Sequence, residues 1–168
     1  VDYAFNMGDI DDSLKGNVNL RGLMNIAPVL NSATFPGAPI QHGFGVGGTT
    51  PSQKGHATLL GDYTIGNWTV DAAWHWFSGL TKNGVYGAGQ TFYAQNYVGS
   101  FSTMDFTLAR QITFDNGSVM SAYFNVQNAF NAIPPDLLGS SGNPGGINTP
   151  IGEDLMGRYF IIGIRGNL

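Results

Sequence analysis

Hydrophobic and polar positions alternate regularly in the last segment of the chain. Phe160, Ile162 and Ile164 occupy every second position, and the residues between them are polar or glycine except for Ile161. Successive side chains of a β-strand point to opposite faces, so a period of two predicts a strand with one apolar and one mostly polar face. Leu168 continues the apolar parity at the end of the sequence.

The same alternation recurs upstream, and we predict about seven strands in all. The two clearest segments run from Met104 to Phe114 and from Met120 to Phe130, and Asp115-Asn116-Gly117 separates them. Asn-Gly between two alternating segments is the strongest short-range signal for a β-hairpin. The remaining apolar parities run from Val1 to Met7, Val18 to Ile26, Ala57 to Ile65 and Trp68 to Trp76.

The connections between these strands alternate in length. Short ones fall near residues 8 to 16, 66 to 67 and 115 to 117, and long ones near 31 to 55, 79 to 100 and 131 to 156. Outer-membrane barrels have short turns on the periplasmic side and long loops on the extracellular side. The pattern therefore predicts an all-β, antiparallel transmembrane β-barrel segment whose C-terminal end lies at the periplasmic face.

This orientation also predicts girdles of aromatic residues at both membrane interfaces. Expected at the periplasmic ends are Tyr63, Trp68 and Phe114, and expected toward the outer ends are Trp76, Phe101, Phe130 and Phe160. A soluble β-sandwich also has alternating strands, but its loops are not segregated by length in this way. The bacterial outer membrane is therefore the expected location.

Composition supports a sheet that faces lipid. Only 11% of the 168 residues are charged, against about 25% in a typical soluble domain, while Gly reaches 25 residues and aromatics 12%. Mean hydropathy is close to zero, at −0.03, which alternating strands produce because they show lipid only every second side chain. No apolar stretch approaches the 18 or so residues of a transmembrane helix.

Charge and cysteine content exclude several other classes. The sequence has no Cys, so neither a disulfide framework nor a Cys-based zinc or redox site is expected. A formal net charge of −4 argues against binding to nucleic acid, which favours a basic face. The segment after Val1 lacks the basic and apolar regions of a signal peptide, so the chain is expected to be mature or to begin elsewhere.

Three segments resemble one known family. Ser102-Thr103-Met104-Asp105-Phe106 is an Asp-hydrophobic strand, Phe124 to Asn131 is followed by Pro134-Pro135, and Gly157-Arg158-Tyr159-Phe160 opens the final strand. These segments resemble the C-terminal part of TonB-dependent outer-membrane transporters. The resemblance covers roughly residues 56 to 168, and upstream only the rhythm of strands and loops supports it.

The resemblance implies that residues 1 to 168 are one part of a larger barrel domain. Family members have about 22 strands and a plug inside the lumen, and the expected plug, TonB box and N-terminal strands are absent from this sequence. The family chain commonly ends on an aromatic residue that the barrel assembly machinery reads, whereas this one ends on Leu168. The residues expected to form this assembly end are Phe160, Ile162, Ile164 and Leu168.

About seven strands cannot close a barrel of that size. An open sheet edge in lipid leaves unpaired backbone groups that cost several kcal/mol each, so other strands are expected to complete the sheet. Those strands and the plug could belong to the same polypeptide or to a separate chain.

Two sets of residues are candidates for function. The polar parity is expected to line the barrel lumen, where it contacts either the plug or the solute; its candidates are Arg21, Asp62, Asp71, His75, Asp105, Asn125, Gln127 and Arg165. Aromatic residues on outer loops suit stacking on a sugar, a chelate or an aromatic ring. The loop candidates are Phe44, Tyr86, Phe92, Tyr93 and Tyr97.

Other patterns are better explained structurally. The glycines from Gly43 to Gly48 match a dinucleotide fingerprint, but no helical period follows them. Asp9, Asp11 and Asp12 lack the Gly and the Glu of a calcium loop and fit a solvated turn. His56 and His75 share the polar parity without a third metal ligand. We therefore predict no metal, no cofactor and no enzymatic activity.

The resemblance implies a function in active import. A scarce solute such as a siderophore, a saccharide or an aromatic compound binds at the cell surface, and the TonB energy-coupling complex pulls on the plug while the solute crosses to the periplasm. One alternative is a passive porin or a surface-adhesin barrel. The other is a soluble β-rich carbohydrate-binding module.

Overall fold

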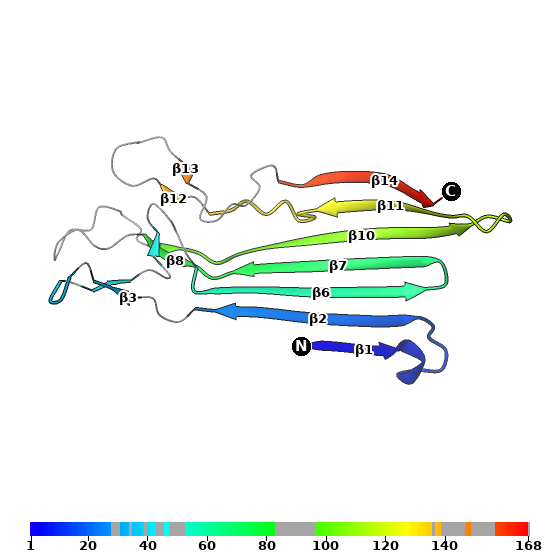
Figure 1. Ribbon diagram of the computed structural model, residues 1–168, viewed down its shortest axis with the longest axis horizontal. Helices are drawn as coiled ribbons and strands as arrows, with labels where there is room; N and C mark the ends of the chain where they lie inside the picture. Colours follow the sequence, from blue (N-terminus) through cyan, green and yellow to red (C-terminus); the bar gives the residue numbers. More distant parts are fainter. Residues whose placement is uncertain are drawn as a thin grey trace.

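The computed structural model is built around one antiparallel sheet of seven strands (Figure 1). It describes residues 1–27, 31–33, 35–38, 40–42, 46–47, 53–82, 97–135, 137–138, 147–148 and 157–167. The sheet contains, in this spatial order, β1 (Asp2–Asn6), β2 (Asn17–Ile26), β6 (Gly55–Ile65), β7 (Trp68–Phe77), β10 (Phe101–Thr113), β11 (Val119–Gln127) and β14 (Tyr159–Asn167). Each strand is a neighbour in space of the next long strand along the chain, as in an up-and-down meander.

The expected all-β antiparallel architecture is confirmed, and the sheet is open. β1 and β14 form its two edges, each hydrogen-bonded to one neighbour only in the described sheet. Within the described ranges, no helix is long and apolar enough to cross a membrane.

Short and long connections lie at opposite ends of the sheet, as the sequence predicts. The connections after β1, β6 and β10 are short and lie at the end where the C-terminus lies (Figure 1). The tight turns use glycines with positive φ, 56° at Gly66 and 85° at Gly117. A residue without Cβ adopts this region at little cost, which is why Gly sits at these two positions.

The acidic cluster near the N-terminus shapes the first short connection. A 3-10 helix, η1 (Met7–Asp9), begins there, and the Asp9 carboxylate accepts a hydrogen bond of 3.3 Å from the backbone N–H of Asn6. The Ser13 hydroxyl and backbone N–H donate to Asp11 at 2.6 and 2.8 Å and hold the pKa of that carboxyl below its ordinary value. The predicted turn is confirmed, with these carboxylates as its internal hydrogen-bond acceptors.

Short strands occur in the long connections, where the sequence predicts loops. Their alternating patterns are too short to be detected in the sequence. They are β3 (Asn31–Ser32), β4 (Gln41–His42), β5 (Val46–Gly47), β8 (Leu80–Lys82), β9 (Tyr97–Val98), β12 (Leu137–Leu138) and β13 (Ile147–Asn148). Leu80 and Val98, which pair across β8 and β9, are the buried hydrophobic residues of the described chain, 2% and 3% exposed.

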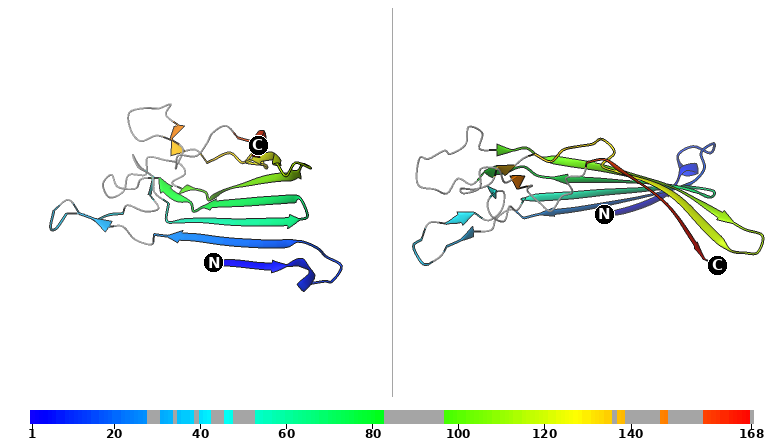
Figure 2. Two further views of the ribbon diagram at one scale, coloured as in Figure 1. Left: turned by 45° about the vertical axis from the view of Figure 1, so that its right-hand side comes forward. Right: turned by 90° about the horizontal axis from the view of Figure 1, so that it is seen from above.

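The long strands form a single twisted layer (Figure 2). Residues paired directly across neighbouring strands point to the same face. One row that crosses all seven strands contains Tyr3, Leu20, Gly61, Ala72, Phe106, Val126 and Phe160. This row and the others of its parity define the apolar face, on which large side chains such as Ile162 (79%) and Ile164 (71%) are exposed.

The opposite side is the polar face. The row next to the one above contains Ala4, Asn19, Asp62, Asp71, Thr107, Asn125 and Ile161. Ile161 is an apolar exception, as predicted, and Leu23 and Leu60 are two more that the same register places on this face. The sheet is thus amphipathic across its full width, with its apolar face uncovered in the described structure.

Candidate functional site

All eight residues predicted to line the lumen lie on the polar face. Asp62 pairs with Asp71, Asp71 with Thr107, and Thr107 with Asn125, so these share one row. Each of the other five lies on the same face, because it is an even number of residues along its strand from a residue of this row or pairs with a residue that is. They are Arg21, His75, Asp105, Gln127 and Arg165.

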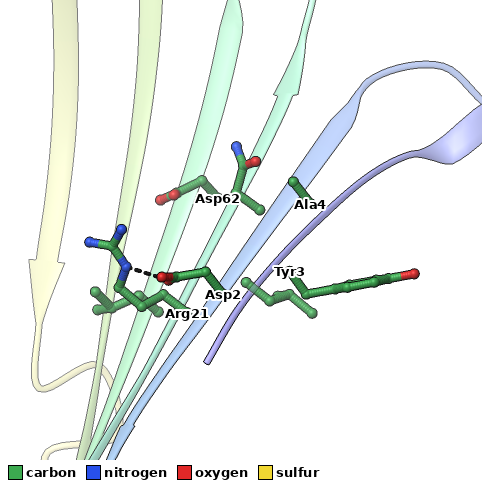
Figure 3. A pocket seen from close by; sticks show the side chains of 8 residues that line it. Asp2, Tyr3, Ala4, Arg21 and Asp62 are labelled. Carbon is green, nitrogen blue, oxygen red and sulfur yellow. Dashed lines mark hydrogen bonds and ion pairs between the residues drawn. The ribbon is translucent and has the colours of Figure 1, made fainter.

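One hollow in this face lies beside β1, with a volume of about 410 Å³. Arg21 Nε lies 2.6 Å from Asp2 Oδ1, and Asp62 lies on the same side of the sheet, while Tyr3 points away from them (Figure 3). The two paired side chains are 59% and 69% exposed. An ion pair this open to solvent contributes little to stability.

A second hollow of about 160 Å³ lies toward the long connections. It brings together residues from β7, β10, β11 and β14. Three of them were predicted from the sequence, namely His75, Asp105 and Gln127; the other lining residues are Phe77, Phe101, Thr103, Asn128, Gly157 and Tyr159. A cleft of this size is smaller than the roughly 300–1,000 Å³ of typical small-molecule sites.

Asp105, one of the residues that line this second hollow, is held in place by its neighbours. Its Oδ1 accepts a hydrogen bond of 2.7 Å from the backbone N–H of Asn128, and its Oδ2 lies 3.8 Å from His75 Nε2. The Thr58 hydroxyl lies 3.3 Å from the other ring nitrogen of His75. The hydrogen bond from Asn128 fixes the orientation of the Asp105 carboxylate, and His75 lies between this carboxylate and the Thr58 hydroxyl.

Aromatic and amide groups complete the lining. His56 stacks on Phe77 with ring centroids 4.5 Å apart, and the Tyr159 hydroxyl donates a hydrogen bond to Gln127 Oε1. Among the described residues, no three His, Asp or Glu side chains are grouped so that they could hold a metal ion. The arrangement can donate and accept hydrogen bonds beside an aromatic surface.

Phe101 corrects one sequence-based prediction. It was expected in the outer aromatic girdle, but it pairs with Phe77 and lines the second hollow, on the polar face. Asp105 lies four residues later on the same strand, and residues an even number apart point to the same face. This spacing is the signal in the sequence that predicts the position of Phe101. By contrast, Trp76 lies on the apolar face, and the Phe130 ring meets Phe106, a residue of the same face, edge to face at 6.5 Å.

Asn125 has a mainly structural role. Its Nδ2 donates hydrogen bonds to Thr107 Oγ1 at 2.8 Å and to the carbonyl of Phe106 at 3.3 Å. Its Oδ1 is buried without a hydrogen-bond partner in the described structure. Since its side-chain donors are engaged within the sheet, Asn125 stabilises the pairing of β10 and β11 and has no free N–H to offer a solute.

The segment from Asn128 to Asn131 forms a clasp next to the second hollow. The Asn128 side chain donates to the carbonyl of Ala132 and accepts from its N–H, both at 2.8 Å. Asn131 Oδ1 accepts from the backbone N–H of Arg158 at 3.0 Å, which ties β14 to the end of β11. The asparagines have positive φ, 48° and 53°, which Asn tolerates better than most residues.

The remaining candidate residues lie on β9, on β14 or outside the described residues. Tyr97 lies in β9 opposite Thr81 and is 56% exposed. Phe160, Ile162 and Ile164 lie on the apolar face of β14. Outside the described residues lie Phe44, Tyr86, Phe92, Tyr93 and Leu168.

Comparison with protein-family models, with curated proteins and with solved structures finds no match to this chain.

Proposed function

We propose that the chain forms part of the wall of a TonB-dependent transporter in the bacterial outer membrane, which binds a scarce solute at the cell surface and imports it into the periplasm. The observation that carries the proposal is the seven-stranded sheet whose apolar face is exposed across its whole width. Soluble monomers rarely expose apolar patches larger than a few hundred Å². A lipid bilayer is the covering that this face fits best.

The dimensions of the apolar face support lipid over a second protein layer. Trp68 and Trp76 stand on this face, eight residues apart on β7, which is about 27 Å along a strand. On a strand tilted by roughly 40°, the separation of the two residues along the membrane normal is somewhat shorter than this and approaches the apolar band of about 25 Å between two aromatic girdles. Strands of 9 to 13 residues in β2, β6, β7, β10, β11 and β14 also exceed the five or six residues usual in soluble sheets.

The connections give the wall its orientation. Short turns at one end and long connections at the other match the periplasmic and extracellular sides of such barrels. The second hollow lies at the long-connection end of the polar face, among Asp105, His75 and Tyr159. A solute arriving from outside would meet this end first, so we assign it to solute contact.

The edges of the sheet call for further strands. β1 and β14 each carry backbone groups without a neighbour in the described sheet, and in lipid such groups cost several kcal/mol each. The proposed partners are the remaining barrel strands, the plug, the TonB energy-coupling complex acting on the plug, the barrel assembly machinery and outer-membrane lipid. The family resemblance of the segments Ser102–Phe106, Phe124–Asn131 and Gly157–Phe160 is what favours a plugged transporter over an open pore.

Spin labels on introduced cysteines test the membrane proposal, since the chain has no Cys of its own. In the complete polypeptide that contains this chain, reconstituted in lipid, Ala72→Cys and Ala122→Cys label the apolar face. Their matched controls, Ala73→Cys and Ser121→Cys, are adjacent residues on the polar face. We expect the apolar-face labels to be accessible to oxygen and shielded from an aqueous nickel complex, with less oxygen at the controls.

Two results would count against the proposal. Labels at Ala72 and Ala122 that are shielded from both reagents would indicate a second protein layer, as in a soluble carbohydrate-binding module. Conductance in planar bilayers distinguishes a passive porin from the proposed transporter, because a plugged transporter gives no steady open channel. Steady conductance by the complete polypeptide would favour a passive porin.

A further inference from the structure

Arg110 is a cation on the apolar face. Among the described strands of the main sheet, it is the one charged residue on that face, between Leu108 and Ile112 on β10. The sequence pattern contains this exception, but the surrounding apolar residues conceal it. A charge in this place needs a partner, because hydrocarbon cannot solvate it.

The position of Arg110 is at the edge of the apolar band. It pairs with Trp68 on one side and with Ala122 on the other. Trp68 is the first residue of β7 and follows directly on the Gly66-Asn67 turn. The guanidinium therefore lies at the level where the neighbouring hairpin ends, which is the interface with the short-turn side.

The Trp68 ring orients the guanidinium. The Arg110 guanidinium carbon lies 5.1 Å from the ring centroid, within the range of a cation–π interaction. No carboxylate within the described residues forms an ion pair with Arg110, whereas Arg21 pairs with Asp2 on the polar face. Arg110 thus has an aromatic support and an unneutralised charge.

We propose that Arg110 and Trp68 form a binding site for the phosphate of a phospholipid headgroup in the leaflet on the short-turn side; this rests on the proposed membrane location. The planar guanidinium matches a phosphate with two parallel hydrogen bonds, and stacking on Trp68 pre-orients it. The apolar side chains of Leu108, Phe124 and Ile162 continue the face toward the membrane centre, where the acyl chains lie. Free phosphate would gain nothing from that surface.

Lipid retention in native mass spectrometry tests the site. The complete polypeptide that contains this chain is purified in detergent and titrated with dioleoyl phosphatidylglycerol. We expect Arg110→Gln to weaken the tightest lipid-binding step about tenfold or more, as loss of hydrogen bonds to a charged group implies. Arg110→Lys keeps the charge without the planar fork. Its lipid affinity is expected to lie between that of the parent protein and that of Arg110→Gln.

Arg165→Gln is the matched control. Arg165 has the same charge and lies at the same end of the sheet, opposite Ser121, but on the polar face. Its replacement is expected to change lipid retention less than twofold. Trp68→Leu leaves the Arg110 charge in place and removes only its support, so weaker retention in this variant tests the site even if Arg110→Gln does not fold.

The lipid source has its own test. Dioleoylglycerol, which lacks the phosphate, is expected not to be retained, and inorganic phosphate at equal concentration is expected not to displace the lipid. Equal retention by the parent protein, Arg110→Gln and Trp68→Leu would overturn the site, and displacement by inorganic phosphate would overturn its assignment to lipid. Failure of the membrane proposal would instead appear in the spin-label accessibilities at Ala72 and Ala122, which do not depend on Arg110.

Discussion

Asp62 on β6 lies directly opposite Asp71 on β7 in the register of the polar face. Like charges that oppose each other across two strands destabilise a sheet by about 0.2–1 kcal/mol. We therefore expect Asp71→Asn to raise the free energy of unfolding of the complete polypeptide, measured in urea, by an amount in this range, and to raise the urea midpoint accordingly. Asp2→Asn, which removes an attraction to Arg21 on the same face, is the control and should change the midpoint in the opposite direction. A lower midpoint for Asp71→Asn would show that the two carboxylates are held by a shared partner.

A charge introduced on the apolar face should be far more costly than one on the polar face. Ala72 lies midway between Trp68 and Trp76 on the apolar face, and its neighbour Ala73 faces the other way, opposite Leu60. In the proposed membrane location Ala72 lies near the bilayer midplane, where a lysine costs about 2–4 kcal/mol, so the proposal predicts that Ala72→Lys lowers both the urea midpoint and the amount of protein assembled in the outer membrane.

Ala73→Lys is the matched comparison for this lysine. It adds the same side chain to the same strand, and the register places it beside Asp105 rather than lipid. We expect a change in unfolding free energy of less than about 1 kcal/mol, as for an exposed ion pair. Equal losses in the two variants would contradict the assignment of one face to lipid.

The Asn128 clasp should contribute to stability through both its side chain and its backbone. Asn128→Gly keeps the left-handed conformation but leaves the N–H of Ala132 without its partner, at a cost of about 1–3 kcal/mol. Asn128→Ala loses the same hydrogen bonds and also places a Cβ in the left-handed region, which adds about 1–2 kcal/mol. Thermal unfolding should therefore rank the parent protein above Asn128→Gly and that variant above Asn128→Ala. Equal stability of the two variants would show that the left-handed backbone conformation at position 128 contributes nothing to the difference between them.

The long strands could be predicted from the sequence because period two extends over many residues in each. The eight candidate lumen residues from Arg21 to Arg165 share one face for the same reason, since parity alone decides the face of a strand. Phe101 is an aromatic residue of the kind that forms girdles, yet it lies on the polar face because position along β10, and not residue type, decides the face. The proposed lipid contact of Arg110 could not be predicted, because a single charge among apolar positions of a strand indicates no site until its contact with Trp68 is known.

The clasp and the second hollow could be predicted only in part. Asn128 to Asn131 end the segment from Phe124 that resembles the family, but the structure of the clasp depends on two positive φ angles and on a contact with Arg158, 27 residues beyond Asn131. Gly157 lies in the same place with a φ of 72°, and a Cβ there would lie 2.7 Å from Asn131 Oδ1. Contacts of such sequence separation depend on how β14 docks on β11, and no local pattern encodes that.

Gly163 and Tyr123 provide the final prediction, because they pair across β14 and β11 and the Tyr123 ring lies over the glycine backbone. A Cβ at position 163 would collide with that ring, so Gly163→Ala should displace it and cost about 1–3 kcal/mol. In a Tyr123→Ala background the collision is gone, and Ala in place of Gly should be neutral or stabilise the strand by about 0.5–1 kcal/mol. The sign of the Gly163→Ala effect should thus change between the two backgrounds in a double-mutant cycle measured by urea unfolding. An additive cycle would mean that the ring does not cover the glycine in the folded protein.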